Sequence, residues 1–87
     1  PRVQSMANAQ QRVYRTFCHL MNDLGVEKEQ IITIECPITT TEIATISGTS
    51  RETVSQLLKQ LKADKILSCK NKKFTIHQPS FFHECVG

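Results

Sequence analysis

Polar and charged side chains gather on one side of a helix that the sequence predicts after Ser50. At about 100° per residue, the apolar residues of this helix fall within an arc of roughly 100° and are Val54, Leu57, Leu58 and Leu61. An arc of roughly 140° on the opposite side holds Arg51, Glu52, Ser55, Gln56 and Lys59. Arginine can donate two hydrogen bonds to guanine O6 and N7, and glutamate can accept one from cytosine N4. The pattern therefore predicts a helix that packs through one face and could read DNA bases with the other.

A simpler role for Arg51 and Glu52 stays open at this point, because Glu52 would also complement the positive end of the helix dipole. The charge of the surrounding segment bears on the choice. Residues 51–73 carry seven basic and two acidic side chains, a net charge of +5, whereas the whole chain has a formal net charge of +3. A solvated surface explains such a cluster as readily as a nucleic-acid patch does, so charge alone does not decide between them.

A local capping signal marks the element that precedes this helix. Thr39 stands three residues before Glu42, which is the capping-box arrangement, and it predicts a short helix from Thr40 to Ser47. Gly48 can adopt the positive φ that ends such a helix. The sequence therefore predicts a short helix followed at once by a turn.

The second helix begins just after this turn. The Ser50 hydroxyl can cap a helix that runs from Arg51 to about Asp64. Two helices joined by a glycine-containing turn describe a helix-turn-helix unit, whose second helix enters the major groove in DNA-binding proteins. Such units also occur in proteins that bind no DNA, so the pattern alone is a weak signal.

A longer helix and a short strand are predicted upstream. Apolar residues recur there at steps of three, four and seven, and they are Met6, Val13, Phe17, Leu20, Met21 and Leu24. This spacing predicts an amphipathic helix from about Ser5 to Leu24, with Gly25 as its stop. The segment Ile31–Ile38 is rich in β-branched residues, and Ile32, Ile34 and Cys36 would share one face. Because Pro37 fits only an edge position, we expect a short edge strand.

Two β-prone segments, Ile66–Lys70 and Phe74–His77, follow the second helix. The polar residues that join them are Asn71, Lys72 and Lys73. Such a connection suits a β-hairpin, which would form a wing. The tail, Gln78–Gly87, contains Phe81 and Phe82 and could fold a last turn back onto the core. The expected fold is mainly α with a small β-hairpin wing, a winged helix-turn-helix.

Size and composition predict a single domain over residues 1–87 and exclude a large catalytic scaffold. Apolar residues make up 39% of the chain, and none of its segments approaches the roughly 18 apolar residues that a membrane span needs. The chain starts at Pro1 without an initiator Met and shows no secretory signal pattern. We therefore expect a soluble, cytoplasmic fragment of a longer protein.

Neither a metal site nor an enzyme active site is predicted. The four cysteines are Cys18, Cys36, Cys69 and Cys85. Their wide spacing argues against a zinc ribbon or a thioredoxin-like motif, so we expect reduced thiols, with Cys18 and Cys69 as small buried apolar residues. His83 and Cys85 lie close together in the sequence, but two ligands do not close a metal site. No set of serine, histidine and aspartate can be defended as a catalytic triad.

The stretch from Thr39 to Leu61 resembles the C-terminal DNA-binding domain of the CRP/FNR family of bacterial regulators. The segment Gly48-Thr-Ser-Arg-Glu-Thr-Val54 is similar to that family's signature at the turn and at the start of its recognition helix. The resemblance extends upstream to Gln11–Val13 and downstream through Asp64–Leu67 and the basic hairpin, so it covers most of the chain.

The resemblance implies a role for each matching residue. The base-reading residues would be Arg51, Glu52, Ser55 and Gln56. The residues on the DNA backbone would be Thr39, Thr40, Ser50, Thr53, Lys59, Lys70, Lys72 and Lys73. The family usually has Arg at the position of Gln56, and glutamine prefers adenine N6 and N7, so the half-site would differ there. For the wing lysines, solvated turn residues remain an equal alternative.

The resemblance also implies partners. The parent protein would be a homodimer on a pseudo-palindromic operator in double-stranded DNA, with an N-terminal sensor and a dimerisation helix that lie outside this chain. RNA polymerase is a candidate further partner, a membrane is not, and no cofactor is expected in this domain. A second interpretation is a winged-helix module that binds an acidic protein partner; a DNA affinity whose logarithm falls linearly with the logarithm of the salt concentration would exclude it. A third is a thiol-based redox enzyme, which four thiols of ordinary reactivity would exclude.

Overall fold

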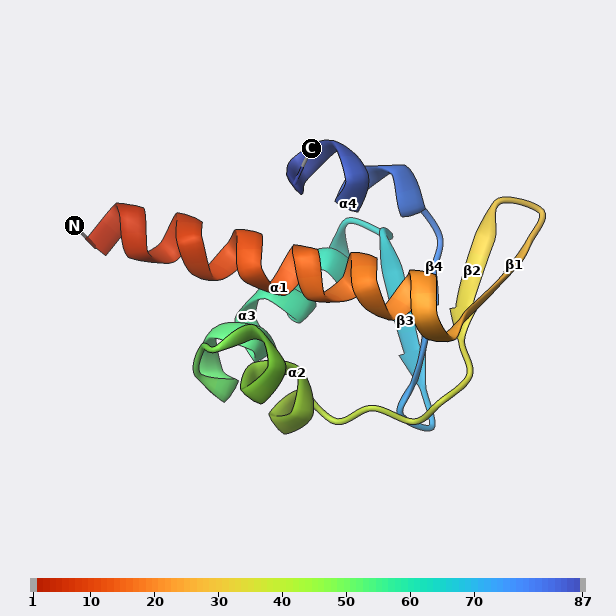
Figure 1. Cartoon of the computed structure of the whole chain (residues 1–87), viewed down its shortest axis with the longest axis horizontal. Helices are drawn as coiled ribbons and strands as arrows, with labels where there is room; N and C mark the ends of the chain where they lie inside the picture. The colour runs from red at the N-terminus through yellow and green to blue at the C-terminus, as the bar shows by residue number, and fades with distance from the viewer. Residues whose placement is uncertain (1, 87) are drawn as a thin grey trace.

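The computed structural model describes residues 2–86, with side chains described for residues 8–84, and places four helices and four strands along them. The helices are α1 (Arg2–Leu24), α2 (Thr40–Ser47), α3 (Arg51–Ala63) and α4 (Pro79–Val86). The strands are β1 (Gly25–Lys28), β2 (Ile31–Ile34), β3 (Leu67–Lys70) and β4 (Lys73–Ile76). Figure 1 shows α1 crossing the molecule between the α2–α3 pair and α4, with the sheet at its C-terminal end. The arrangement is a winged helix-turn-helix, as the sequence predicts.

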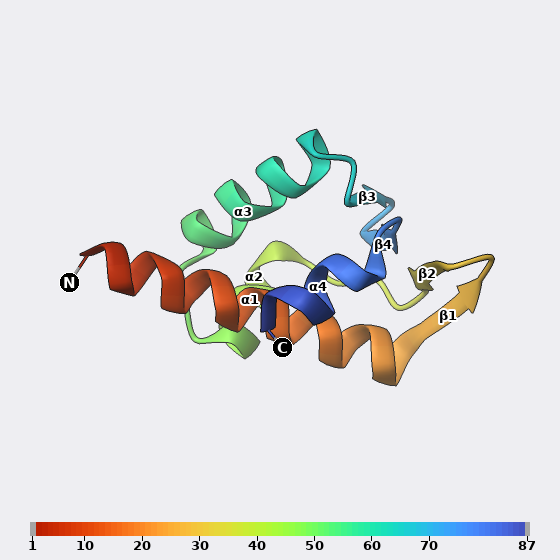
Figure 2. The ribbon, with the colours of Figure 1, turned by 90° about the horizontal axis from the view of Figure 1, so that it is seen from above.

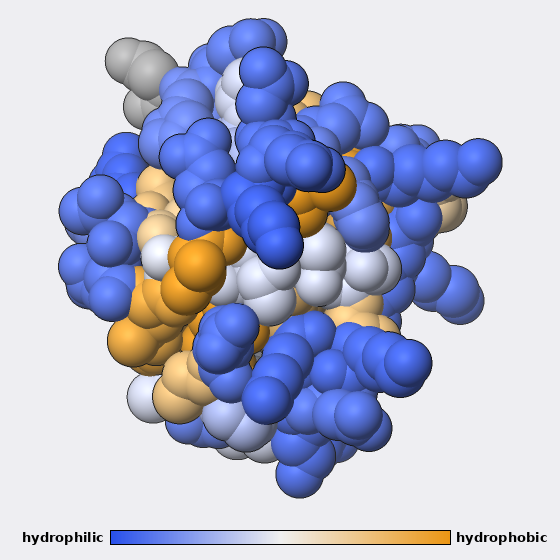
Figure 3. Space-filling model, turned by 90° about the vertical axis from the view of Figure 1, so that its right-hand side faces the viewer, coloured by the Kyte–Doolittle hydropathy of each residue, from blue (hydrophilic) through white to orange (hydrophobic). Residues whose placement is uncertain are grey.

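The four strands form one antiparallel sheet in the order β1-β2-β4-β3. Ile34 lies opposite Phe74, and Leu67 lies opposite Ile76, so these buried residues share the face that packs on the helices. The other face is open. Figure 3 views the molecule from the side of β1 and β2, where hydrophilic residues cover most of the surface around a smaller hydrophobic patch.

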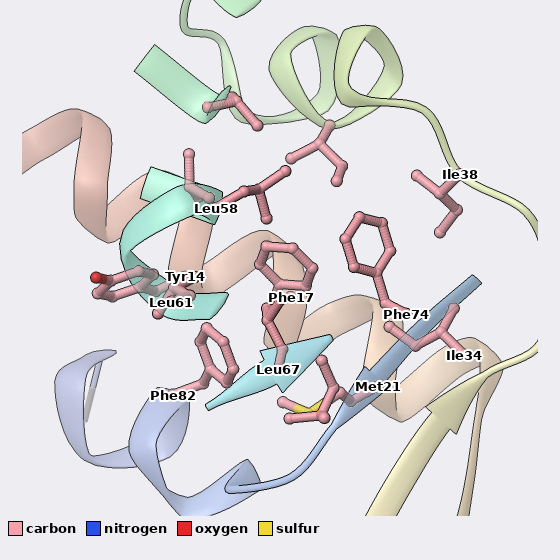
Figure 4. Packing of buried hydrophobic residues seen from close by; sticks show 14 of the residues in the cluster. Tyr14, Phe17, Met21, Ile34, Ile38, Leu58, Leu61, Leu67, Phe74 and Phe82 are labelled. Carbon is pink, nitrogen blue, oxygen red and sulfur yellow. The ribbon is translucent and has the colours of Figure 1, made fainter. Parts of the chain in front are cut away.

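The core lies between α1, the inner face of the sheet and the α2–α3 pair. Phe17 is fully buried at its centre, with its ring centroid 5.4 Å from that of Phe74 and 5.3 Å from that of Phe82 (Figure 4). Helix α3 contributes Leu58 and Leu61, which are both buried. Because buried residues of α2 and α3 belong to the same cluster as those of α1, the sheet and α4, the helix-turn-helix unit is anchored to the whole domain.

The predicted single turn at the C-terminus is a helix of eight residues instead. Pro79 occupies its first position, where the missing N–H costs nothing because that donor has no partner inside the helix. Phe82 is fully buried against Tyr14 and Phe17 of α1, and Phe81 packs edge-on against Tyr14. Figure 2 shows α4 lying along α1, so the tail closes one side of the core.

The prediction of an edge strand at Ile31–Ile38 was wrong in two respects. Strand β2 ends at Ile34, which leaves Cys36 and Pro37 in the connection to α2. It is also an inner strand, because β1 pairs with its free side. Gly25 does end α1 as predicted, and the chain then turns at once into β1. A Cβ at position 25 would collide with the Met21 carbonyl and the Ile32 side chain, so only glycine permits this turn.

The predicted wing is confirmed with a tighter turn. β3 ends at Lys70 and β4 begins at Lys73, so the turn consists of Asn71 and Lys72 alone. Both have positive φ, 54° and 65°, which matches the twist that a two-residue hairpin turn requires. Lys73 is therefore a strand residue and lies directly opposite Lys70.

Two helix predictions need correction in detail. α1 begins at Arg2 rather than at about Ser5, and α3 ends at Ala63, with Asp64 as its C-cap. The predicted apolar face of α1 holds at Val13, Phe17 and Met21, which are buried, but Leu24 is 42% exposed because the helix ends beside it. The side chain of Met6 lies outside the described residues.

Candidate nucleic-acid interface

Helix α2 begins with the predicted capping box. The Glu42 backbone N–H donates to the Thr39 hydroxyl at 3.1 Å, and the Thr39 backbone N–H donates to the Glu42 carboxylate at 3.1 Å. At its other end Gly48 has a φ of 72°, and its N–H donates to the Ala44 carbonyl at 2.9 Å. These contacts fix both ends of a helix of only eight residues, which would be marginal alone.

Helix α3 is capped at its start by Ser50. The Thr53 backbone N–H donates to the Ser50 hydroxyl at 3.1 Å, and the two side-chain hydroxyls lie 2.8 Å apart. Val54, Leu58 and Leu61 are buried as predicted, whereas Leu57 is only half-buried. The buried residues hold one side of α3 against the core. The opposite side is therefore presented to solvent in a fixed orientation.

A shallow, open groove runs along this presented side. Its lining residues are Thr40, Thr41, Arg51, Glu52, Ser55 and Gln56. The structure thus brings together all four residues that the sequence predicts as base readers, and each of them is exposed. Thr40, predicted as a backbone contact, lies at their edge.

Thr41 is an addition that the sequence reasoning missed. It is exposed in the first turn of α2 and lines the same groove. Helical periodicity could have predicted its exposure, because Thr41 lies roughly 200° around the helix axis from the buried Ile43. Thr39, by contrast, is half-buried and its hydroxyl is engaged with Glu42, so it shapes the site mainly through the cap.

The wing tip lies against the start of α2. The Ile38 backbone N–H donates to the Lys72 carbonyl at 2.8 Å, which ties the turn of the hairpin to the segment just before Thr39. Lys70, Lys72 and Lys73 are all exposed there. The hairpin thus holds three lysine side chains within four consecutive positions, close to the helix start that borders the groove. Lys59 is also exposed, one turn beyond Ser55 on α3.

The cysteines do not form a site among the residues that the structure describes. Cys36 and Cys69 are exposed thiols, and Cys18 is half-buried. The prediction that Cys69 is buried was wrong: Cys69 is exposed on β3, the edge strand, although Leu67, two residues earlier on the same strand, is buried. Cys85 has no described side chain. Within the described part of the chain, no three His, Cys, Asp or Glu residues are grouped as metal ligands, and no helix is long and apolar enough to cross a membrane.

Comparison with known proteins agrees with this architecture. A model of the Crp-like helix-turn-helix domain matches residues 11–84. The HTH-type transcriptional regulator ArcR of Staphylococcus aureus strain MSSA476 is 27% identical over 78 residues, which cover 90% of this chain and 33% of ArcR. The chain therefore spans about a third of the length of this relative.

Two solved structures are similar in fold. The CO-dependent transcription factor CooA from Carboxydothermus hydrogenoformans, in its imidazole-bound form, gives a TM-score of 0.81 at 29% identity, over 91% of this chain and 37% of CooA. Reduced CprK without ligand gives a TM-score of 0.79 at 27% identity, over 88% of this chain and 37% of CprK. Since the family model spans the capped helix pair, the groove and the wing, the chain belongs to the Crp-like helix-turn-helix domain family.

Proposed function

We propose that this domain binds double-stranded DNA and reads its sequence, as the DNA-binding part of a bacterial CRP/FNR-type transcription regulator. The observation that carries the proposal is the groove along α3, where four exposed polar side chains converge on a helix anchored by its opposite face. An α-helix with side chains is about 10–12 Å across, which fits the roughly 12 Å width of the major groove.

Within this proposal the groove residues read bases and have distinct preferences. Arg51 would donate to guanine O6 and N7, Glu52 would accept from cytosine N4, and Gln56 would pair with adenine N6 and N7. Ser55 is compatible with several bases. A half-site that contains an A·T pair at the position of Gln56 is therefore expected.

The wing would bind phosphates. Lys70 lies directly opposite Lys73 in the hairpin, and like charges at opposite positions of an antiparallel pair are destabilising. A polyanion at the wing would remove this repulsion. Thr39, Thr40, Ser50, Thr53 and Lys59 would complete the backbone contacts; Ser50 and Thr53 also hold the helix start. Phosphate contacts of this kind supply affinity that falls with salt.

The parent protein is proposed to act as a homodimer on a pseudo-palindromic operator, with half-sites one helical turn, about 34 Å, apart. The chain spans only about a third of the length of ArcR and of CooA, both named as transcription regulators, which supports a longer parent protein. RNA polymerase is proposed as a further partner and the bacterial cytoplasm as the location, since both accompany transcription. We propose that the domain itself needs no cofactor and that any effector is sensed elsewhere in the parent protein.

The test compares Arg51→Ala with wild type on duplexes selected from a random-sequence pool. Loss of the guanine contact should cost about 1–3 kcal/mol, concentrated at one base pair. Arg15→Ala removes the same charge from an exposed site on α1 and serves as the control. Equal loss on every duplex would show that Arg51 only positions the domain. Affinity for mixed-sequence duplex that shows no linear fall with log salt would reject DNA binding and favour an acidic protein partner.

A further inference from the structure

A buried polar contact joins α1 to the end of α2. Thr16 and Ser47 are 4% and 6% exposed, and their hydroxyl oxygens lie 2.8 Å apart. The Thr16 hydroxyl also donates to the Arg12 carbonyl at 2.9 Å. Since a hydroxyl has a single proton to donate, Ser47 must be the donor in the shared contact. The proton chain therefore runs from Ser47 to Thr16 to the backbone of α1.

A second contact from α1 reaches the next residue of the turn. The Arg12 guanidinium donates to the Gly48 carbonyl at 3.4 Å. Ser47 is the last residue of α2, Gly48 is its left-handed C-cap, and only two residues separate Gly48 from Arg51. Helix α1 thus holds the two residues from which the chain turns into α3.

Apolar packing alone would fix the position of this turn relative to α1 less precisely. Hydrophobic contacts are non-directional, so the α2–α3 pair could shift along α1 with little change in buried area. Hydrogen bonds between two buried side chains specify one arrangement. Base-reading side chains depend on such support, because contacts to bases need placement within about 0.5 Å.

We propose that Thr16 and Ser47, aided by Arg12, are positioning residues that set the orientation of α3 and thereby the sequence discrimination of the domain. The proposal rests on the proposed DNA binding. It adds that discrimination depends on a polar contact made by α1, outside the groove. Phosphate binding by the wing does not depend on this contact, because Lys70, Lys72 and Lys73 lie on the separate β3–β4 hairpin.

The decisive variant is the double substitution Thr16→Val with Ser47→Ala. Removing both partners leaves no unpaired buried hydroxyl, so unfolding should stay close to wild type, whereas Thr16→Val alone leaves Ser47 without an acceptor and should destabilise. Affinity is measured on two duplexes of equal length, one carrying the selected half-sites and one of mixed sequence. The ratio of the affinity for the selected duplex to that for the mixed duplex should fall about threefold to tenfold, as expected for loss of one hydrogen bond. Affinity for the mixed duplex should fall less than affinity for the selected duplex, because the wing lysines keep their phosphate contacts.

Two further variants make the outcome decisive. Thr16→Ser keeps the hydroxyl and should retain the wild-type ratio. If the double variant fails to fold, Arg12→Met is tested in its place, and Arg15→Met is the control that removes the same charge. Only Arg12→Met should lower the ratio of the affinities for the selected and mixed duplexes. If wild type binds both duplexes equally or neither, the proposed function fails. If wild type discriminates and the double or Arg12 variant discriminates equally well, the positioning proposal fails on its own.

Discussion

Replacing Gln56 with arginine should change the base preference at one position of the half-site from A·T to G·C. Gln56 is exposed in the groove, five residues after Arg51. At 1.5 Å per residue the two lie about 7.5 Å apart along α3, and bases follow one another every 3.4 Å or so. The altered base pair should therefore lie about two steps from the pair read by Arg51.

The size of the change in base preference depends on two competing contacts of the arginine introduced at position 56, one to guanine and one to Glu52. A bidentate contact to guanine discriminates by about 1–3 kcal/mol, which corresponds to about 5- to 150-fold in affinity. The same group would stand four residues after Glu52, where an ion pair contributes only about 0.2–0.5 kcal/mol. The base contact is the larger effect and should prevail once DNA is bound.

The assay is selection of duplexes from a random pool with wild type and Gln56→Arg, followed by fluorescence anisotropy on duplexes that differ at single base pairs. Gln60→Arg is the matched control, because it adds the same charge on α3 at a residue whose amide donates to Asp64 rather than facing the groove. Any general gain from charge appears in both variants. If Gln56→Arg strengthens binding to all duplexes equally, residue 56 contacts phosphates and the base-reading assignment is refuted.

Three further variants test the rest of the site and its support. Lys72→Gln should weaken binding to all duplexes alike and lower the salt slope by about 1, unlike Lys28→Gln on β1; a sequence-dependent loss would contradict a phosphate contact. Gly48→Ala should cost about 1–2 kcal/mol in urea unfolding, since φ is 72° but no atom lies within 4 Å of the added Cβ; unchanged stability would refute the strain argument. Phe82→Ala should cost about 3–5 kcal/mol in thermal unfolding because its ring is fully buried, and Phe81→Ala should cost less; equal losses would mean that α4 is not anchored through Phe82.

Local signals were sufficient to predict the helix pair and its presented face. The Thr39 capping box, the left-handed Gly48 and the Ser50 cap each act within a few residues, so the sequence contains all that determines them. The groove followed because helical periodicity assigns Arg51 and Gln56 to one side once the buried side is known. Helical periodicity places Thr41 away from the buried Ile43, but it does not show that this side of α2 borders the presented side of α3, which only the packing of the two helices reveals.

Features that depend on distant partners were predicted less well. Strand β1 contains Glu27 and Lys28, which have low β-propensity, and it forms because β2 lies beside it. The same pairing makes β2 an inner strand, which Pro37 seemed to forbid until it proved to lie beyond the strand. Cys69 likewise is exposed although Leu67, two residues earlier on β3, is buried, because burial depends on how far the helices extend over the sheet face, which alternation along the strand cannot reveal.

The hydrogen bond between Ile38 and Lys72 has a consequence for how relatives of this domain can diverge. Because the hairpin tip is fastened to the connection between β2 and α2, lengthening that connection would release the tip from the helix start. The spacing between wing and helix contacts would then change although no lysine had been altered. The length of the loop at residues 35–39 thus sets the distance on the duplex between the contacts of the wing and those of the helices.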